Sequence, residues 1–318
     1  MDKEYITDWF RGLQDRICAA LEGADGKGRF ERDAWERPGG GGGLARVIRR
    51  GNILEKGGVN FSAVHGETPA QLLGHLQPEL GMGSQPGLRP EGATLADAPR
   101  PGPDFYATGV SIVLHPYNPM VPIIHMNVRY FEMSTGVRWF GGGIDLTPHY
   151  VDEEDARYFH GRLRAVCDRH HPAYYSRFKA WADDYFYLKH RQETRGIGGI
   201  FFDHLAPDAS TSAEEIFAFV RDVGDCLAPL YTHLMRKNAG LAFGEPEKQW
   251  QSLRRGRYVE FNLVWDRGTK FGLDTDGRTE SILMSLPPHA QWEYDHRPEP
   301  GSRERATLNW LRKGVAWA

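Results

Sequence analysis

Two neighbouring stretches of the chain, Gly109–His115 and Ile123–Glu132, alternate apolar and polar residues with a period of two. This period is typical of half-buried β-strands. The apolar positions of both stretches fall on one side: Val110, Ile112, Leu114, Ile124, Met126, Val128 and Tyr130. His125, Asn127 and Arg129 fall on the other side of the second stretch. The pattern predicts two strands with an apolar back and a strongly polar front, joined by the proline-rich connection HPYNPMVP.

Helices are predicted in blocks. Near the N-terminus an apolar residue recurs every four positions, as in an amphipathic helix: Tyr5, Trp9, Leu13, Ile17 and Leu21. Further helices are expected over Val151–His170, over Pro172–His190 and over residues 213–240, the last capped by Thr211 or Ser212. Because helices and strands are grouped and do not alternate, the pattern favours an α+β fold over a doubly wound parallel sheet.

The segment after residue 256 also alternates, which predicts more strands. In Arg257–Asp266 one side would carry these residues: Val259, Phe261, Leu263 and Trp265. The turns DRGT and DTDGR then lead to Lys270–Leu273 and Ser281–Leu286. Closely spaced strands with short turns favour antiparallel pairing.

Two segments predict irregular structure. A glycine run such as Gly39–Gly43 could cradle a phosphate in front of a helix. No GK[ST] follows it, so a mobile loop or a tight turn is favoured. Residues 75–104 are rich in proline and glycine and predict a surface loop or insertion within a single domain of residues 1–318.

Composition excludes several classes of protein. Of the 318 residues 40% are apolar and 25% charged, an ordinary globular balance with enough apolar mass for a sizeable core. The net charge of −3 gives no nucleic-acid signal. Three separated cysteines (Cys18, Cys167 and Cys226) favour a reducing compartment. We find neither targeting features in MDKEYITDWF nor an apolar run of about 18 residues, and expect a cytoplasmic protein without a transmembrane segment.

Four histidines are candidate metal ligands: His115, His125, His160 and His190. Two belong to the predicted strands, and two come late in helices that could pack over those strands. Four imidazoles could hold a divalent transition metal. The alternative is that each is an ordinary core or surface histidine, because their spacings match no compact motif such as HExxH.

Arginines and glycine-rich turns supply the other candidates. The planar fork of arginine binds carboxylates in bidentate fashion, and Arg129 shares a strand face with His125. Arg195 and Arg278 stand in or beside glycine-rich turns, whereas Arg191 is better explained as a solvated surface charge.

The glycine-rich strings WFGGGIDLTP and RGIGGIFFD are expected to form turns that let the backbone approach a flat ligand. They contain Asp145 and Asp203, either of which could act as a base, accept a hydrogen bond from a ligand N–H or cap a turn.

Five strings carry a resemblance over residues 57–288: GGVNFSAVHGE, ATGVSIVLHPYNPMVPIIHMNVRYFE, WFGGGIDLTP, DDYFYLKHRQETRGIGGIFFD and GRYVEFNLVWDRGTKFGLDTDGRTESILMSLPP. In this order they resemble the signatures of the oxygen-dependent coproporphyrinogen-III oxidases. That family converts two propionates of coproporphyrinogen III to vinyl groups with dioxygen, giving protoporphyrinogen IX in haem biosynthesis. The resemblance implies a broad antiparallel sheet flanked by helices on both faces, in one domain that forms a homodimer.

The resemblance also implies roles for individual residues. His125 corresponds to the proton donor, and Asp145, singled out above from the residues alone, is a further catalytic candidate. The implied substrate contacts are Ser111, Asn127, Val128, Arg129, Asp276, Gly277 and Arg278, to which Arg195 is added as a carboxylate ligand. The four histidines named above fall on positions described as divalent-metal ligands, and Tyr258–Glu293 on a segment linked to dimer formation.

The sequence lacks a nucleotide fingerprint, CxxCH and a three-cysteine cluster, so we expect no organic cofactor and take dioxygen as the co-substrate. Two alternatives stay open, a metal-dependent dioxygenase that uses the histidines and a porphyrin carrier without catalysis.

Overall fold

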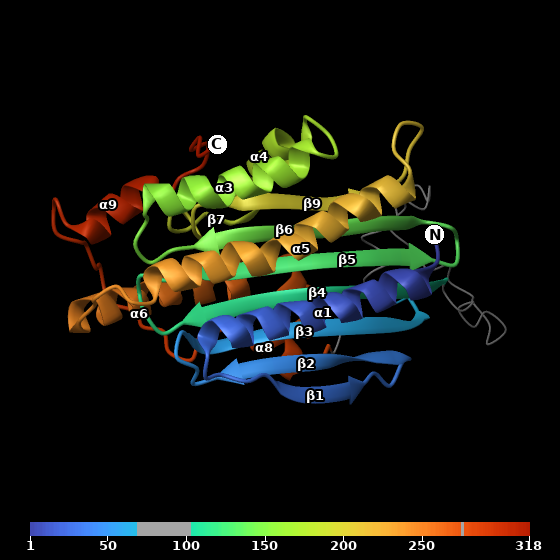
Figure 1. The fold of residues 1–318 in the computed structure, drawn as a ribbon, viewed down its shortest axis with the longest axis horizontal. Coiled ribbons are helices and arrows are strands. Elements are labelled where there is room, and N and C mark those ends of the chain that lie inside the picture. The colour runs from blue at the N-terminus through green and yellow to red at the C-terminus, as the bar shows by residue number, and fades with distance from the viewer. Residues whose placement is uncertain (69–102, 275–276) are drawn as a thin grey trace, which may run out of the picture.

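A computed structural model describes residues 1–68, 103–274 and 277–318 (Figure 1). Its centre is an antiparallel sheet of seven strands in the order β1-β2-β3-β4-β5-β6-β9. The strands are β1 Glu31–Glu36, β2 Gly41–Arg49, β3 Leu54–Glu67, β4 Asp104–Pro116, β5 Ile123–Met133, β6 Arg138–Thr147 and β9 Gly199–Leu205. A small hairpin pairs β7 Tyr187–Leu188 with β8 Glu193–Thr194. The two strands predicted from alternation are the centre of β4 and nearly all of β5.

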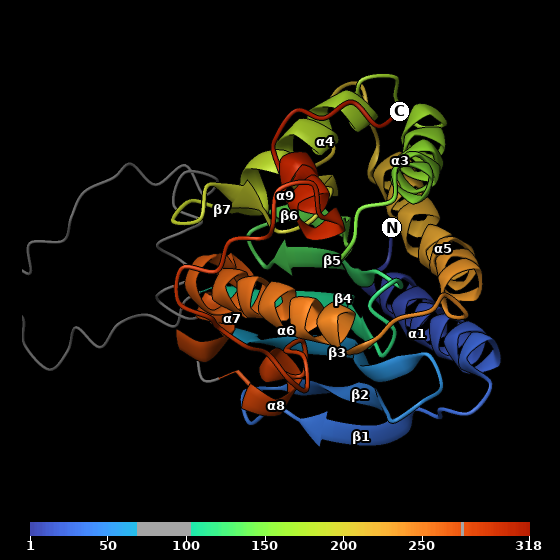
Figure 2. The same cartoon turned by 90° about the vertical axis from the view of Figure 1, so that its left-hand side faces the viewer.

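Helices cover both faces of the sheet, as the edge-on view in Figure 2 shows. One layer holds α1 Lys3–Asp25, α3 Glu153–Asp168 and α5 Ala213–Asn238. The opposite face is covered by α6 Glu245–Glu260, the π-helix η1 Phe261–Trp265, α7 Arg267–Asp274 and α8 Thr279–Leu283. Two more helices, α4 Tyr174–Tyr185 and α9 Arg303–Trp310, lie on the β9 side of the sheet, where α4 packs beside β9. The predicted α+β class and the two helical layers are confirmed.

The main hydrophobic core fills the space between the sheet and the α1–α3–α5 layer. The predicted apolar backs of β4 and β5 point into it, and Ile112, Leu114, Met126 and Val128 are fully buried. Each such side chain contributes roughly 1.5–3 kcal/mol relative to exposure. Since the apolar faces point into this core, the polar faces of the same strands must point toward η1 and α6–α8.

The N-terminal helix is confirmed, but its predicted stripe is only partly buried. Leu13, Ile17 and Leu21 belong to the core, whereas Tyr5 is 54% exposed. A four-residue step turns an α-helix by roughly 400°, so a stripe of this spacing drifts by roughly 40° at each step. Ile6 and Phe10 take the buried positions near the start of the helix instead.

The three strands predicted after residue 256 are wrong. This segment forms the end of α6, then η1, α7 and α8. Tyr258, Phe261 and Asn262 are buried at helical spacing, whereas Leu263 and Val264 are half exposed. A short apolar run fits periods of 2 and 3.6 almost equally, and contacts with distant residues decide between them.

One glycine-rich expectation needs correction, and the other is confirmed in part. WFGGGIDLTP is not a turn but most of β6. Of Gly39–Gly43, only the first two residues belong to the turn between β1 and β2, because β2 begins at Gly41. Gly40 and Gly41 have φ of 114° and 78°, so a tight turn, and not a phosphate cradle before a helix, accounts for them.

The remaining helices agree with the sequence. The helix expected over residues 213–240 is α5, whose N-terminus has a capping box formed by Ser212 and Glu215. Val151–His170 contains α3, and the helix expected over Pro172–His190 ends early, at Tyr185. The predicted loop 75–104 lies almost entirely outside the described residues.

Candidate active site

The strand register places polar side chains in a row across the sheet. Asp33, Asn60, Ser111 and Asn127 are linked pair by pair, through Ala45 of β2, on the side that faces η1 and α8. Directly opposed residues of antiparallel strands project from the same face. On β5, Arg129 lies two residues from Asn127 in one direction and His125 two residues from it in the other, so the three side chains share one face, as the sequence predicts. The polar front is therefore a continuous surface that spans at least four strands.

His125, at the β5 end of this surface, is held by a buried ion pair. Asp145 lies directly opposite it on β6, and His125 Nδ1 is 2.8 Å from Asp145 Oδ1. Arg195 Nη2 donates to both carboxylate oxygens, at 2.7 and 2.8 Å. Asp145 is 1% exposed and Arg195 is 3% exposed. Burial alone would raise the pKa of Asp145, but the charges of Arg195 and His125 outweigh burial and hold this pKa below its ordinary value.

The Arg195 guanidinium is enclosed by aromatic rings. Its central carbon lies 4.4 Å from the ring centroid of Phe186, 4.8 Å from that of Tyr258 and 4.6 Å from that of Phe261. A further N–H, on Nη1, donates to Asn262 Oδ1 at 3.0 Å. This cation therefore serves the Asp145 carboxylate and not a ligand in solvent.

The contact with Asp145 decides which nitrogen of His125 carries a proton. A carboxylate only accepts hydrogen bonds, so the proton is on Nδ1. Arg195 Nη2 is also 3.4 Å from Nδ1, but the carboxylate contact is shorter, at 2.8 Å, and therefore determines where the proton lies. Among the described residues Nε2 makes no hydrogen bond, and the His125 side chain is 21% exposed. The ring thus presents Nε2 for proton exchange while Asp145 fixes its orientation.

Arg129 crosses the polar surface beside β6. Its guanidinium donates to Asn127 Oδ1 at 2.7 Å and pairs with Asp203 Oδ1 at 2.7 Å. Gly141 leaves room for this arrangement, because a Cβ there would lie 2.6 Å from the same Asp203 oxygen and 2.9 Å from the Arg129 guanidinium carbon. Gly141 therefore gives room to the side chains of Arg129 and Asp203 within a strand, whereas the sequence led us to expect a close approach to a flat ligand at a turn. Arg129 stays 32% exposed.

Arg278 lies toward the other edge of the same face. It pairs with Asp33 of β1 and donates to Ser281 Oγ at 3.1 Å. β1 and β5 are four strand spacings apart, which is roughly 19 Å at about 4.8 Å per spacing. Gly277 donates its backbone N–H to Gly272 O, and Asp276 lies outside the described residues.

Val128 is placed differently from the other predicted contacts. Its side chain is fully buried in the core on the opposite face of the sheet. Only its backbone is near the polar surface, whereas Ser111 and Asn127 present their side chains there.

The four candidate metal ligands do not converge. His115 is buried, with Nε2 2.8 Å from Ser285 O. His160 lies in the helical layer on the other side of the sheet, between the Tyr175 hydroxyl and Ile197 O, both at 3.0 Å. His190 contacts Glu260 and Trp265. In the part of the chain that the structure describes, no group of three His, Cys, Asp or Glu side chains could hold a metal. The four histidines therefore do not fit a shared metal ion.

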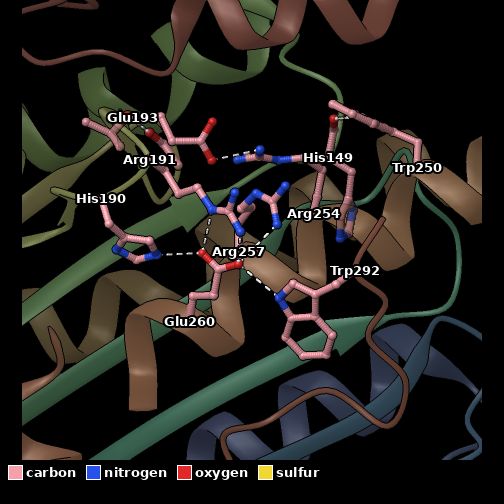
Figure 3. Close-up of polar contacts among 11 residues, drawn as sticks. His149, His190, Arg191, Glu193, Trp250, Arg254, Arg257, Glu260 and Trp292 are labelled. Atoms are coloured by element: carbon pink, nitrogen blue, oxygen red, sulfur yellow. Dashed lines mark hydrogen bonds and ion pairs between the residues drawn. The ribbon is translucent and has the colours of Figure 1, made fainter. Parts of the chain in front are cut away.

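Glu260 is the centre of a polar network beside the site (Figure 3). Its carboxylate receives N–H groups from His190, Arg191, Arg257 and Trp292 at 2.7–3.1 Å. Burial would raise the pKa of Glu260, but the hydrogen bonds from Arg191 and His190 outweigh burial and lower it to about 2. Arg191 is a surface charge with a structural partner, which agrees with its interpretation from sequence.

Sequence reasoning missed Asn262, Phe186 and Tyr258, which surround Arg195. Asn262 was assigned to a strand, so its contact with Arg195 could not be foreseen. The signal that could have found it is the spacing of Tyr258, Phe261 and Asn262, which fits one helical face.

Comparison with known proteins shows which family the chain belongs to. The family described as coproporphyrinogen III oxidase matches residues 5–317. The chain belongs to the coproporphyrinogen III oxidase family. It is 48% identical to the oxygen-dependent coproporphyrinogen-III oxidase of Parasynechococcus marenigrum, over 96% of this chain and 85% of that protein. It is also 48% identical to the chloroplastic enzyme of Glycine max and 47% identical to coproporphyrinogen-III oxidase 1 of Arabidopsis thaliana, each over 94% of this chain and 75% of the relative.

Proposed function

We propose that this chain catalyses the oxidative decarboxylation of two propionates of coproporphyrinogen III, giving protoporphyrinogen IX with dioxygen as the oxidant. The observation that carries the proposal is the pairing of a family match over nearly the whole chain with a partly exposed His125, which a buried Asp145–Arg195 pair holds in place. The test is turnover of coproporphyrinogen III with simultaneous measurement of oxygen uptake and carbon dioxide release.

The electron balance sets what the protein must supply. Converting one propionate to a vinyl group releases carbon dioxide, a proton and two electrons. Two conversions release four electrons, which reduce one dioxygen to two waters or two dioxygen molecules to hydrogen peroxide. Oxygen reduction consumes protons, so a proton donor beside the substrate is required. His125 Nε2 is the exposed atom that can deliver them.

Asp145 acts through His125. With 1% exposure it has no oxygen free for the substrate, and its lowered pKa keeps it ionised. It holds the Nδ1 proton and stabilises the imidazolium when Nε2 is protonated, while Arg195 balances its charge. Asp203, with a 24% exposed side chain next to Arg129, is the carboxylate that can meet a pyrrole N–H.

The propionates that are retained bind to arginines on the same face. Coproporphyrinogen III carries four carboxylates, which are ionised at neutral pH. Arg129 and Arg278 lie near the two ends of the row of polar residues, beside Asn127 and Asp33. Each keeps N–H donors beyond those used by Asp203 and Asp33. Ser111 and Asn127 lie between them as polar contacts for the macrocycle.

We also propose a homodimer that uses Tyr258–Glu293. Half-exposed apolar side chains concentrate here: Leu263, Val264, Leu273 and Trp292. Contiguous exposed apolar surface marks interaction sites on soluble proteins. A dimeric mass by light scattering at micromolar concentration is expected, and a monomeric mass would refute this assembly.

Residues 1–318 are proposed to form one domain, because Ile6 near the N-terminus and Trp317 near the C-terminus belong to the same core. Among the described helices, none is long and apolar enough to span a membrane. A cytoplasmic location stays a prediction, and some of the relatives are chloroplastic by name.

A further inference from the structure

The π-helix η1 brings two residues to the buried cation of the site. Asn262 Oδ1 accepts from Arg195 Nη1 at 3.0 Å, and the Phe261 ring centroid lies 4.6 Å from the Arg195 guanidinium carbon. Single π-turns are rare and occur often at functional sites. A turn of this kind depends on tertiary contacts to keep its shape, so the residues that hold its two ends also fix Asn262.

Both ends of η1 meet at one side chain, His190. Glu260, immediately before η1, lies with its Oε2 2.8 Å from His190 Nε2. Trp265, the last residue of η1, donates its indole N–H to His190 Nδ1 at 2.9 Å and stacks on the imidazole at an interplanar angle of 23°. In Figure 3 the His190 ring points directly at the Glu260 carboxylate.

The chemistry of these partners fixes the protonation state of His190. An indole N–H can only donate, so His190 Nδ1 must accept with its lone pair. An ionised carboxylate can only accept, so His190 Nε2 must carry a proton. The ring is therefore the neutral Nε2–H tautomer, and it has no lone pair left. A metal ligand needs such a lone pair.

We propose that His190 is a positioning residue, a clasp that joins Glu260 to Trp265 and so holds Asn262 against Arg195, and that it is not a metal ligand. Its importance for turnover rests on the proposed function of the His125–Asp145–Arg195 site. The hydrogen bonds that define the clasp do not depend on that proposed function.

The clasp predicts a specific kinetic pattern. Loosening η1 shifts Asn262 and Phe261 and releases Arg195 from one side, while Arg129 and Arg278 still bind the substrate. Small displacements at a reacting centre can lower the rate by about 100-fold. His190→Gln and Trp265→Phe should each lower kcat by about 10- to 100-fold, with KM changed by no more than about threefold. The double variant should be no slower than the slower single variant, because both substitutions open the same clasp.

Trp292→Phe is the matched control. Trp292 donates its indole N–H directly to Glu260, at 2.9 Å, whereas Trp265 donates its indole N–H to His190. This variant makes the same Trp-to-Phe change in the same network but leaves both hydrogen bonds of His190 in place, so it should keep kcat within about twofold of wild type. Equal losses of kcat in Trp265→Phe and Trp292→Phe would show a general contribution of the network to stability and overturn the proposal.

Two further readouts separate the clasp from a metal site and from the proposed reaction. Bound metal per chain, measured by atomic emission, should be the same in wild type and in His190→Gln. A selective loss of metal in His190→Gln would identify a ligand and overturn the proposal. Nitrogen-15 NMR of histidine-labelled protein should show the neutral Nε2–H tautomer for His190, and the indole N–H resonance of Trp265 should move in His190→Gln. This NMR test needs no turnover: if wild type fails to consume coproporphyrinogen III, the proposed function fails, whereas an imidazolium or the Nδ1–H tautomer at His190 refutes the clasp.

Discussion

Asp145→Asn is expected to lower both the stability and the catalytic rate of this protein, through two different physical causes. The change is nearly isosteric, but it removes the charge that balances Arg195 in a site where the two residues are 1% and 3% exposed. Leaving one member of a buried ion pair uncompensated costs about 3–5 kcal/mol of the free energy of unfolding. At roughly 2 °C per kcal/mol for a chain of this length, the melting temperature should fall by about 6–10 °C.

The catalytic loss has a different cause. An Asn amide can donate to His125 Nδ1 and so favour the tautomer with its proton on Nε2, which reverses the roles of the two nitrogens. We expect kcat to fall by about two to four orders of magnitude, the usual contribution of a positioned acid or base. Calorimetry and steady-state oxygen uptake measure the two effects separately.

The double variant Asp145→Asn with Arg195→Met tests whether both effects are understood. Replacing a buried ion pair by uncharged residues of similar volume is often neutral or stabilising. The double variant should therefore recover most of the lost melting temperature and none of the lost kcat. An Asp145→Asn protein as stable and as active as wild type would refute the account of the buried pair.

Because of the same ion pair, the free energy of unfolding should depend on pH in the acidic range. The pKa of Asp145 is lower in the folded protein than its ordinary value, which the unfolded chain keeps. Its contribution is therefore complete above the unfolded pKa of about 4 and is lost as pH falls toward the folded pKa. Asp145→Asn should lose less stability than wild type over this acidic range, and parallel curves of unfolding free energy against pH would contradict the assignment.

Three further predictions concern the exposed side of the site. His125→Ala should lower kcat by about two to four orders of magnitude in a folded protein, and near-normal steady-state turnover would exclude His125 as the proton donor. Arg129→Lys should depress both kcat and kcat/KM, because a lysine cannot reproduce the bidentate fork next to His125; wild-type kinetics would contradict carboxylate binding there. Arg278→Lys should mainly raise KM, because it weakens binding of the ground state and the transition state alike, and a loss confined to kcat would argue against a peripheral propionate.

The sequence predicts the part of the site that lies on β4 and β5. Alternation at His125, Asn127 and Arg129 is local, and the pairing of two adjacent strands preserves it. The opposing position of Asp145 was not foreseeable in the same way, because glycines in WFGGGIDLTP indicate a turn as readily as a strand with a close neighbour. The pairing of this segment with β5 and β9 decides for a strand, in which Gly141 leaves the space that Arg129 and Asp203 occupy.

The other half of the site depends on long-range contacts. Arg195 is separated by 50 residues from Asp145 and by 67 from Asn262, and nothing local in KHRQETRGIGG shows that this arginine is buried between rings. Alternation in Arg257–Asp266 indicated a strand, whereas packing of Tyr258 and Phe261 on Arg195 selects helical turns. The set of four histidines shows the same limit, since His160 lies on the opposite face of the sheet from His125.

The most direct test of the account is oxygen uptake with coproporphyrinogen III, recorded together with carbon dioxide release, before and after exhaustive chelation. We predict two carbon dioxide molecules for each substrate consumed and a rate that chelation leaves unchanged, because the four candidate histidines have separate partners and do not converge on one site, and because His125 Nε2 can supply the protons. Tight binding of coproporphyrinogen III without oxygen uptake, or uptake that chelation abolishes and a divalent metal restores, would contradict it.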